Sequence, residues 1–123
     1  MDRLFDRVLV RAPGKSYKDC VSKNSEHYNI DIQKARKQHE KYVQTLQQYD
    51  FEVTELPPLE SFPDSIFVQD TALIGKKSNK AVLCRFGEPS RRGEEKSISE
   101  FLSKEGFEVK RIEAPGTIEG GDI

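Results

Sequence analysis

The chain has 123 residues, of which 33% are charged and 35% hydrophobic, and its formal net charge is −1. A length of this order suits one domain. The mixture of both charge signs argues against a nucleic-acid partner. No apolar run approaches the roughly 18 residues of a membrane span. The two cysteines, Cys20 and Cys84, are too few for a disulfide framework, which favours a reducing compartment, the cytoplasm.

The first half of the chain predicts a strand, a helix and a second strand. An apolar run at 7–11 predicts the first strand, and the polar stretch 15–29 predicts a loop. Apolar or ring-bearing residues then recur at helical spacing behind Asn29 or Asp31, either of which suits the N-cap. These residues are Ile32, Ala35, His39, Tyr42, Val43, Leu46 and Tyr49. A strand is predicted at 51–56.

The most compact apolar run lies at residues 61–70. Pro63 predicts a turn, and the branched and aromatic residues after it predict a buried strand that continues to Gly75. Asp64 and Asp70 bracket this apolar stretch. A carboxylate beside a buried strand needs a partner, which is either a backbone cap or a cationic ligand.

The second half repeats the order of the first. We expect a polar hairpin at 76–80 and a strand at 81–86. Ser90 then suits the N-cap of a helix with glutamates in its first turn. Gly106 suits the left-handed residue after that helix, and 107–112 predicts the last strand.

An internal repeat supports this arrangement. Residues 8–11 resemble 82–85, and 51–53 line up with 107–109. Asp50 takes the place that a glycine has in the second copy, and aspartate tolerates the left-handed region. Each copy is therefore one ββαβ module of an α/β fold.

Two such modules leave sheet edges open. We therefore expect residues 1–123 to be a single incomplete domain, with module one at about 7–75 and module two at about 81–123. This domain would be the N-terminal part of a longer propeller. Alone, it is expected to be marginally stable or to associate into homo-oligomers.

Two further stretches carry unusual polar residues. Arg91 and Arg92 stand at a predicted helix start, where positive charge opposes the dipole; they are either solvated or a receptor for carboxylate or phosphate. The stretch 119–122, Glu-Gly-Gly-Asp, is either an ordinary turn or a close approach of backbone to ligand. Together with Asp64 and Asp70, Glu119 and one of the two arginines form a set of charges that suits an arginine-like zwitterion. The sequence has no glycine-rich phosphate loop and no metal-ligand cluster, so no cofactor is expected.

Three motifs in order resemble the dimethylarginine dimethylaminohydrolase family, which belongs to the guanidine-modifying superfamily with arginine deiminases and amidinotransferases. They are FPDSIFVQD at 62–70, EPSRRGE at 88–94 and IEAPGTIEGGD at 112–122. The resemblance implies a five-bladed pentein α/β propeller, of which this chain holds about two modules. It also implies hydrolysis of methylated arginine to citrulline and a methylamine through a covalent cysteine thiouronium intermediate.

The resemblance implies roles for the matching residues, with a small guanidino amino acid as the partner. The roles are guanidinium binding for Asp70, α-amino binding for Asp64, carboxylate binding for Arg91, orientation of the catalytic histidine for Glu119 and a backbone contact with the substrate for Val21. Gln69 departs from the family, which usually has an acidic residue beside the guanidinium-binding aspartate. Because an amide binds a cation less strongly, this departure at a substrate-binding position is expected to alter substrate preference or activity.

The catalytic histidine and cysteine of the family lie downstream of the Gly-Gly-Asp motif. His27, His39, Cys20 and Cys84 do not match those positions. His39 and Cys84 are typical of packed residues, and Cys20 is either an ordinary loop residue or a reactive thiol. We therefore expect residues 1–123 alone to be inactive and the nucleophile to lie beyond this chain. Arginine deiminase, amidinotransferase and a non-catalytic propeller that binds other molecules remain alternatives.

Overall fold

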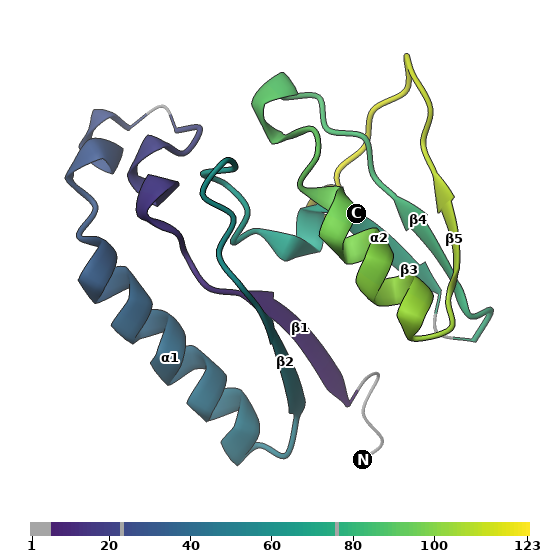
Figure 1. Ribbon diagram of the computed structural model, residues 1–123, viewed down its shortest axis with the longest axis horizontal. Coiled ribbons are helices and arrows are strands. Elements are labelled where there is room, and N and C mark those ends of the chain that lie inside the picture. The colour runs from purple at the N-terminus through teal and green to yellow at the C-terminus, as the bar shows by residue number, and fades with distance from the viewer. Residues whose placement is uncertain (1–5, 23, 76) are drawn as a thin grey trace. The chain divides into compact units, whose positions relative to one another are not determined.

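The structure is a computed structural model that describes residues 6–22, 24–75 and 77–123. The chain divides into two compact units, Met1–Ile66 and Phe67–Ile123 (Figure 1). In each unit a helix connects two parallel strands. This shared order agrees with the internal repeat in the sequence.

The first unit contains two strands and one long helix. Strand β1 (Arg7–Arg11) pairs in parallel with β2 (Glu52–Leu56), and Val8 lies opposite Val53. Helix α1 (Ile32–Gln48) connects the two strands. The two predicted strands and the predicted helix are confirmed.

Both ends of α1 follow from local sequence. The side chain of Asp31 accepts hydrogen bonds from the backbone N–H groups of Gln33 and Lys34 at 3.0 and 3.2 Å, so Asp31 rather than Asn29 is the N-cap. After the helix, Asp50 adopts a positive φ of 65°. This is the left-handed conformation expected there, and an aspartate tolerates it.

The predicted loop between β1 and α1 contains two short 3₁₀ turns. These are η1 (Lys15–Asp19) and η2 (Ser25–Asn29), and Lys23 between them lies outside the described residues. The side chain of Asn24 accepts the N–H of Glu26 at 2.9 Å and so begins η2. Local polar residues therefore organise this segment.

The second unit is a three-stranded sheet with one helix. Strand β3 (Ala72–Gly75) pairs antiparallel with β4 (Lys80–Leu83), and β4 pairs in parallel with β5 (Glu108–Arg111). Helix α2 (Glu95–Lys104) connects β4 to β5. The predicted hairpin is confirmed, although its residue Lys76 lies outside the described residues. The expected module boundary stays a prediction.

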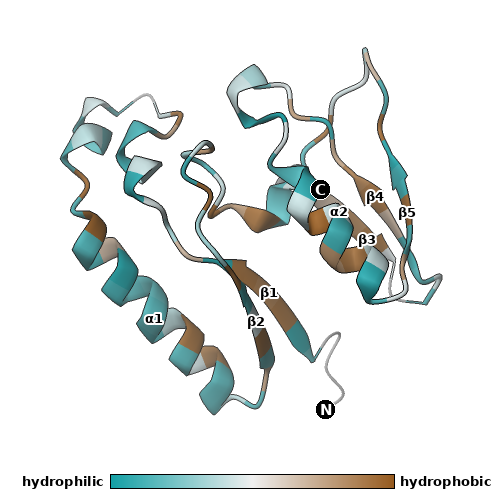
Figure 2. Cartoon of the chain, in the orientation of Figure 1, coloured by the Kyte–Doolittle hydropathy of each residue, from teal (hydrophilic) through white to brown (hydrophobic). Residues whose placement is uncertain are grey.

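Most of the buried hydrophobic side chains belong to the second unit. They are Ala81, Leu83, Cys84, Phe86, Ile98 and Leu102, whereas the first unit contributes Val10 and Val43. Figure 2 shows the hydropathy of the elements: β1 and β4 are mostly hydrophobic (brown), and α1 is mostly hydrophilic (teal). Burying a leucine or phenylalanine of this kind contributes about 1.5–3 kcal/mol to stability. Within the described residues no helix has the length and apolar character to cross a membrane.

The predicted buried strand at 66–68 is wrong. Residues 63–66 form turns, and Val68–Asp70 form a 3₁₀ turn, η3, before β3 begins. The N–H groups of Asp70 and Thr71 donate to carbonyls three residues earlier, so they satisfy the turn rather than a sheet. A short apolar run without alternation is compatible with either structure.

The predicted helix start at Ser90 is also wrong. Residues Pro89–Arg91 form a separate 3₁₀ turn, η4, in which the side chain of Glu88 accepts the N–H of Ser90 at 3.4 Å. Gly93, with φ of 116°, then turns the chain before α2 begins at Glu95. The two arginines therefore precede α2 instead of forming its first turn.

Candidate functional site

Asp70 lies where three short turns of the second unit meet. It belongs to η3; its Oδ1 accepts the backbone N–H of Gly121 at 3.2 Å, and its Oδ2 accepts Nη1 of Arg91 at 3.0 Å. Gly121 lies in the third turn, η5 (Gly120–Asp122). The Asp70 side chain is 17% exposed. One carboxylate, still reachable from solvent, therefore ties together the three motifs that the sequence singled out.

The guanidinium of Arg91 is buried and held from several sides. Its Nε and Nη2 donate to the two carboxylate oxygens of Glu94 at 3.0 and 2.9 Å, and Nη2 also donates to the carbonyl of Phe67 at 3.4 Å. The ring centroid of Phe86 lies 4.3 Å from the guanidinium carbon. Burial by itself lowers the pKa of Arg91, but the bonds and charges of Glu94 and Asp70 outweigh it and raise the pKa. Arg91 is therefore a permanent buried cation.

The contact between Arg91 and Asp70 bears on their predicted roles. The two side chains form an ion pair at 3.0 Å. A carboxylate receptor and a guanidinium receptor would hold opposite ends of an arginine-like ligand. This ion pair therefore has to open if both residues take those roles for one ligand.

The paired glycines of η5 are required because other groups of the second unit approach them closely. A Cβ on Gly120 would clash with the carbonyl oxygen of Gln69 and lie 2.8 Å from that of Ala72. A Cβ on Gly121 would clash with Oδ1 of Asp70. The backbone of η3 and β3 therefore approaches Gly120, and the Asp70 side chain approaches Gly121. The predicted approach to a ligand stays a prediction.

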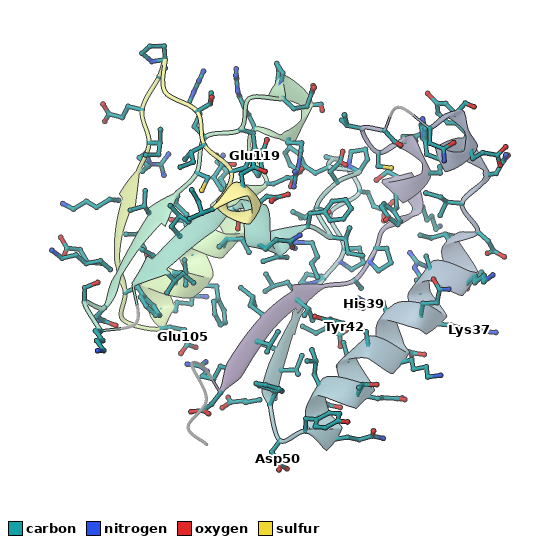
Figure 3. All side chains as sticks on the ribbon, turned by 180° about the vertical axis from the view of Figure 1, so that it is seen from behind. Lys37, His39, Tyr42, Asp50, Glu105 and Glu119 are labelled. Carbon is teal, nitrogen blue, oxygen red and sulfur yellow. The ribbon has the colours of Figure 1, made fainter. Side chains whose placement is uncertain are left out.

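Glu119 and Cys84 complete the polar cluster of the second unit. Glu119 directly precedes η5 and is half-buried (Figure 3). Burial raises the pKa of the Cys84 thiol, a hydrogen bond from the Gly120 backbone opposes the rise, and the charges of Asp70 and Glu119 add to it. Both carboxylates therefore act on the same thiol. The structure brings Asp70, Arg91 and Glu119 into one neighbourhood, with Gln69 exposed beside them.

The first unit brings together the other two predicted residues. The carboxylate of Asp64 is buried and accepts the backbone N–H of Val21 at 3.1 and 3.3 Å. The side chain of Val21 is exposed, so the loop presents its backbone to Asp64. Asp64 therefore has the backbone partner that a buried carboxylate requires.

The cysteines lack the environment of a nucleophile. Burial, followed by the charge of Asp64, raises the pKa of Cys20, and burial raises the pKa of Cys84. A raised pKa lowers the fraction of reactive thiolate at neutral pH. The interpretation of Cys84 as a small buried residue is confirmed, and the environment of Cys20 favours an ordinary loop residue over a reactive thiol.

His39 is a packed residue of α1 (Figure 3). Its side chain is 8% exposed, and its Nε2 lies 3.4 Å from a carboxylate oxygen of Glu55 without good hydrogen-bond geometry. In the described ranges, no three or more His, Cys, Asp and Glu side chains are grouped so that they could hold a metal ion. The polar cluster around Asp70 is thus the strongest candidate site.

Glu94 is the residue that sequence reasoning missed. In the sequence it looks like a solvated glutamate in the first turn of a helix, whereas the structure buries it against Arg91. Its spacing from Arg91 is i,i+3, a separation at which opposite charges meet. Because Arg91 lies in η4 and not in α2, this helical spacing alone could not have identified the pair.

Comparison with known proteins gives consistent matches over nearly the whole chain. A family model described as N,N dimethylarginine dimethylhydrolase, eukaryotic, matches residues 10–122. The N(G),N(G)-dimethylarginine dimethylaminohydrolase of Pseudomonas aeruginosa is 42% identical over 98% of this chain and 46% of that protein. An uncharacterized protein of Aeropyrum pernix is 45% identical over 99% of this chain and 46% of that protein. The chain spans about half the length of the curated relatives it matches.

Solved structures show the same fold. A cysteine variant of the Pseudomonas aeruginosa enzyme complexed with citrulline has a TM-score of 0.90 at 40% identity, over 98% of this chain and 47% of that chain. The N-terminal domain of a cyanobacterial arginine dihydrolase, bound to its product, has a TM-score of 0.80 at 25% identity, over 93% of this chain and 42% of that chain. The predicted α/β fold of the pentein type is confirmed.

Proposed function

Because this chain belongs to the N,N-dimethylarginine dimethylhydrolase family, we propose that its protein hydrolyses the guanidino group of methylated arginine to citrulline and a methylamine. The observation that carries this proposal is the Asp70 carboxylate, which Gly121 and Arg91 orient at the meeting point of the three family motifs. A fixed carboxylate of this kind suits a planar cation that donates two hydrogen bonds.

In this proposal Asp70 binds the guanidinium of the substrate and Arg91 binds its carboxylate. Their ion pair opens on binding, and each partner exchanges one opposite charge for another. Gln69, exposed beside Asp70, contributes an amide where an acidic residue is usual in the family. The cation is therefore held mainly by one carboxylate, which makes Asp70 the dominant group for guanidinium binding.

Two residues take the remaining roles at the substrate, and a third acts on the catalytic histidine. Asp64 binds the α-amino group, and the backbone of Val21, which already donates to Asp64, contacts the substrate. Glu119 orients the catalytic histidine, as the third member of a triad does. The assignments of Asp64 and Glu119 follow the family motifs, and that of Val21 follows its alignment with the substrate-contacting loop of the family.

The reaction requires a thiolate that attacks the guanidinium carbon and a histidine that protonates the leaving methylamine. Water then displaces the cysteine from the thiouronium intermediate and gives citrulline. Cys20 and Cys84 do not suit the first step, because burial raises the pKa of both. We therefore place the nucleophile and the histidine in the part of the relatives' length that this chain does not span.

Product analysis of the full-length protein tests the proposal. Asymmetric dimethylarginine is expected to give citrulline and dimethylamine in equal amounts, with kcat/KM at least about tenfold above that for arginine. Preference for arginine with release of ammonia would identify a deiminase. Transfer to an added amine without net hydrolysis would identify an amidinotransferase, and no turnover would favour the non-catalytic alternative.

The proposed partner is a small guanidino amino acid in the cytoplasm. Citrulline and an S-methyl-L-thiocitrulline adduct occupy the related structures, and a guanidino amino acid, whose side chain is cationic, matches the charges of the Asp70 cluster. Association of several copies of the protein stays a prediction, which follows from the open edges of β3 and β5.

A further inference from the structure

We propose that Glu94 is a positioning residue for guanidino binding. It stays paired with Arg91 and neutralises it, so that the negative charge of Asp70 remains available for a cationic ligand. The inference rests on the proposed function, because it concerns how the same cluster selects a cation.

Glu94 is the most deeply buried carboxylate of this cluster. Its side chain is 1% exposed, against 9% for Arg91 and 17% for Asp70. Both of its oxygens accept hydrogen bonds from Arg91, at 3.0 and 2.9 Å. This two-point contact fixes the plane of the guanidinium, and Nη1 of Arg91 then lies 3.0 Å from Asp70.

The pairing of Glu94 with Arg91 determines the net charge that Asp70 and Arg91 present to a ligand. One cation, Arg91, lies between two carboxylates, Asp70 and Glu94. The three groups together therefore carry one excess negative charge. Without Glu94, Arg91 and Asp70 would neutralise each other, and this pair would offer a cationic ligand no net attraction.

Glu94 also keeps Arg91 stabilised while Arg91 exchanges its other ionic partner. When a ligand guanidinium pairs with Asp70, Arg91 gives up this carboxylate before the carboxylate of the ligand replaces it, and an unpaired buried charge is strongly unfavourable. The two bonds to Glu94, the carbonyl of Phe67 and the ring of Phe86 remain in place. Arg91 therefore stays ordered while Asp70 turns to the ligand.

Binding of two nearly isosteric ligands tests this inference. L-Arginine has a cationic side chain, and citrulline has a neutral one. We would measure both dissociation constants by calorimetry in the full-length protein and in Glu94→Gln, Glu94→Asp and Glu100→Gln. Glu100 is an exposed residue of α2, the helix that begins directly after Glu94, and provides the matched control. Melting curves establish that each variant is folded.

Glu94→Gln is expected to weaken arginine binding about tenfold or more and citrulline binding by less than about threefold. Glu94→Asp keeps the charge and should keep the preference for arginine, and Glu100→Gln should match the unchanged protein. If Glu94→Gln does not fold, Glu94→Asp decides, because loss of its arginine preference would overturn the inference.

The remaining outcomes separate the inference from the proposed function. Equal weakening of both ligands in Glu94→Gln would show a merely structural residue, and no weakening would show a dispensable one; either result overturns the inference and leaves the function intact. If the unchanged protein binds neither ligand, the proposed function fails, and the inference fails with it.

Discussion

Replacing Asp70 with asparagine is expected to lower kcat/KM for dimethylarginine about 100- to 1,000-fold, an effect of the size seen when one fixed charge-stabilising group is removed from a site. Asparagine has nearly the same shape but no charge, so it cannot pair with the guanidinium. Its neutral amide also replaces a carboxylate that now accepts bonds from Arg91 and Gly121. Steady-state kinetics with the full-length protein measures the effect.

The control for this substitution is Asp122→Asn. Asp122 lies in η5, the turn that carries Gly121, and its side chain is exposed. This variant removes the same charge from the same neighbourhood, and its kcat/KM should stay within about twofold. Activity of Asp70→Asn within tenfold of the unchanged protein would show that another group binds the guanidinium.

Replacing Gly120 with alanine is expected to destabilise the protein by about 2–4 kcal/mol, at or beyond the usual cost of overpacking. The added methyl group would meet the carbonyl oxygens of Gln69 and Ala72. These are backbone atoms of η3 and β3, so they cannot move aside as the end of a flexible side chain can. Urea denaturation followed by circular dichroism measures the loss.

Gly87→Ala is the matched control for that substitution. No atom lies within 4 Å of the position that its Cβ would occupy, so the free energy of unfolding should change by less than about 0.5 kcal/mol. If Gly120→Ala were as stable as this control, η5 would not approach η3 as the structure describes.

Local rules in the sequence were sufficient for the regular elements. The Asp31 cap, the left-handed conformations of Asp50 and Gly106, and the repeated order of strand, helix and strand depend on neighbours close in sequence. Such features follow from propensity, periodicity and capping. The structure therefore agrees with the sequence at each of these points.

The two wrong predictions lie at the candidate site. The segment 66–68 has strand-like residues, and Ser90 looks like a helix cap, but both segments form turns. Distant contacts decide their conformation: Arg91 bonds to Asp70 and to the carbonyl of Phe67. Because local preference and tertiary bonding conflict there, the local rules fail at the candidate site.

The burial of Glu94 also depends on tertiary contacts. A glutamate next to the start of a helix is normally solvated and interacts with the helix dipole. Only the folded chain shows that its carboxylate is enclosed with Arg91. The composition of the site was therefore accessible from motifs, whereas the pairing of its charges was not.

The central claim is that the carboxylate of Asp70 binds the guanidino group, and the backbone amide of Gly121 reports on it directly. This N–H donates to Oδ1 of Asp70, so a cation that binds the carboxylate changes the hydrogen bond. Titration of the isotope-labelled full-length protein with dimethylarginine should shift the Gly121 amide resonance and saturate at the ligand concentration where calorimetry shows saturation. Saturating binding that leaves the Gly121 resonance unchanged would contradict the account.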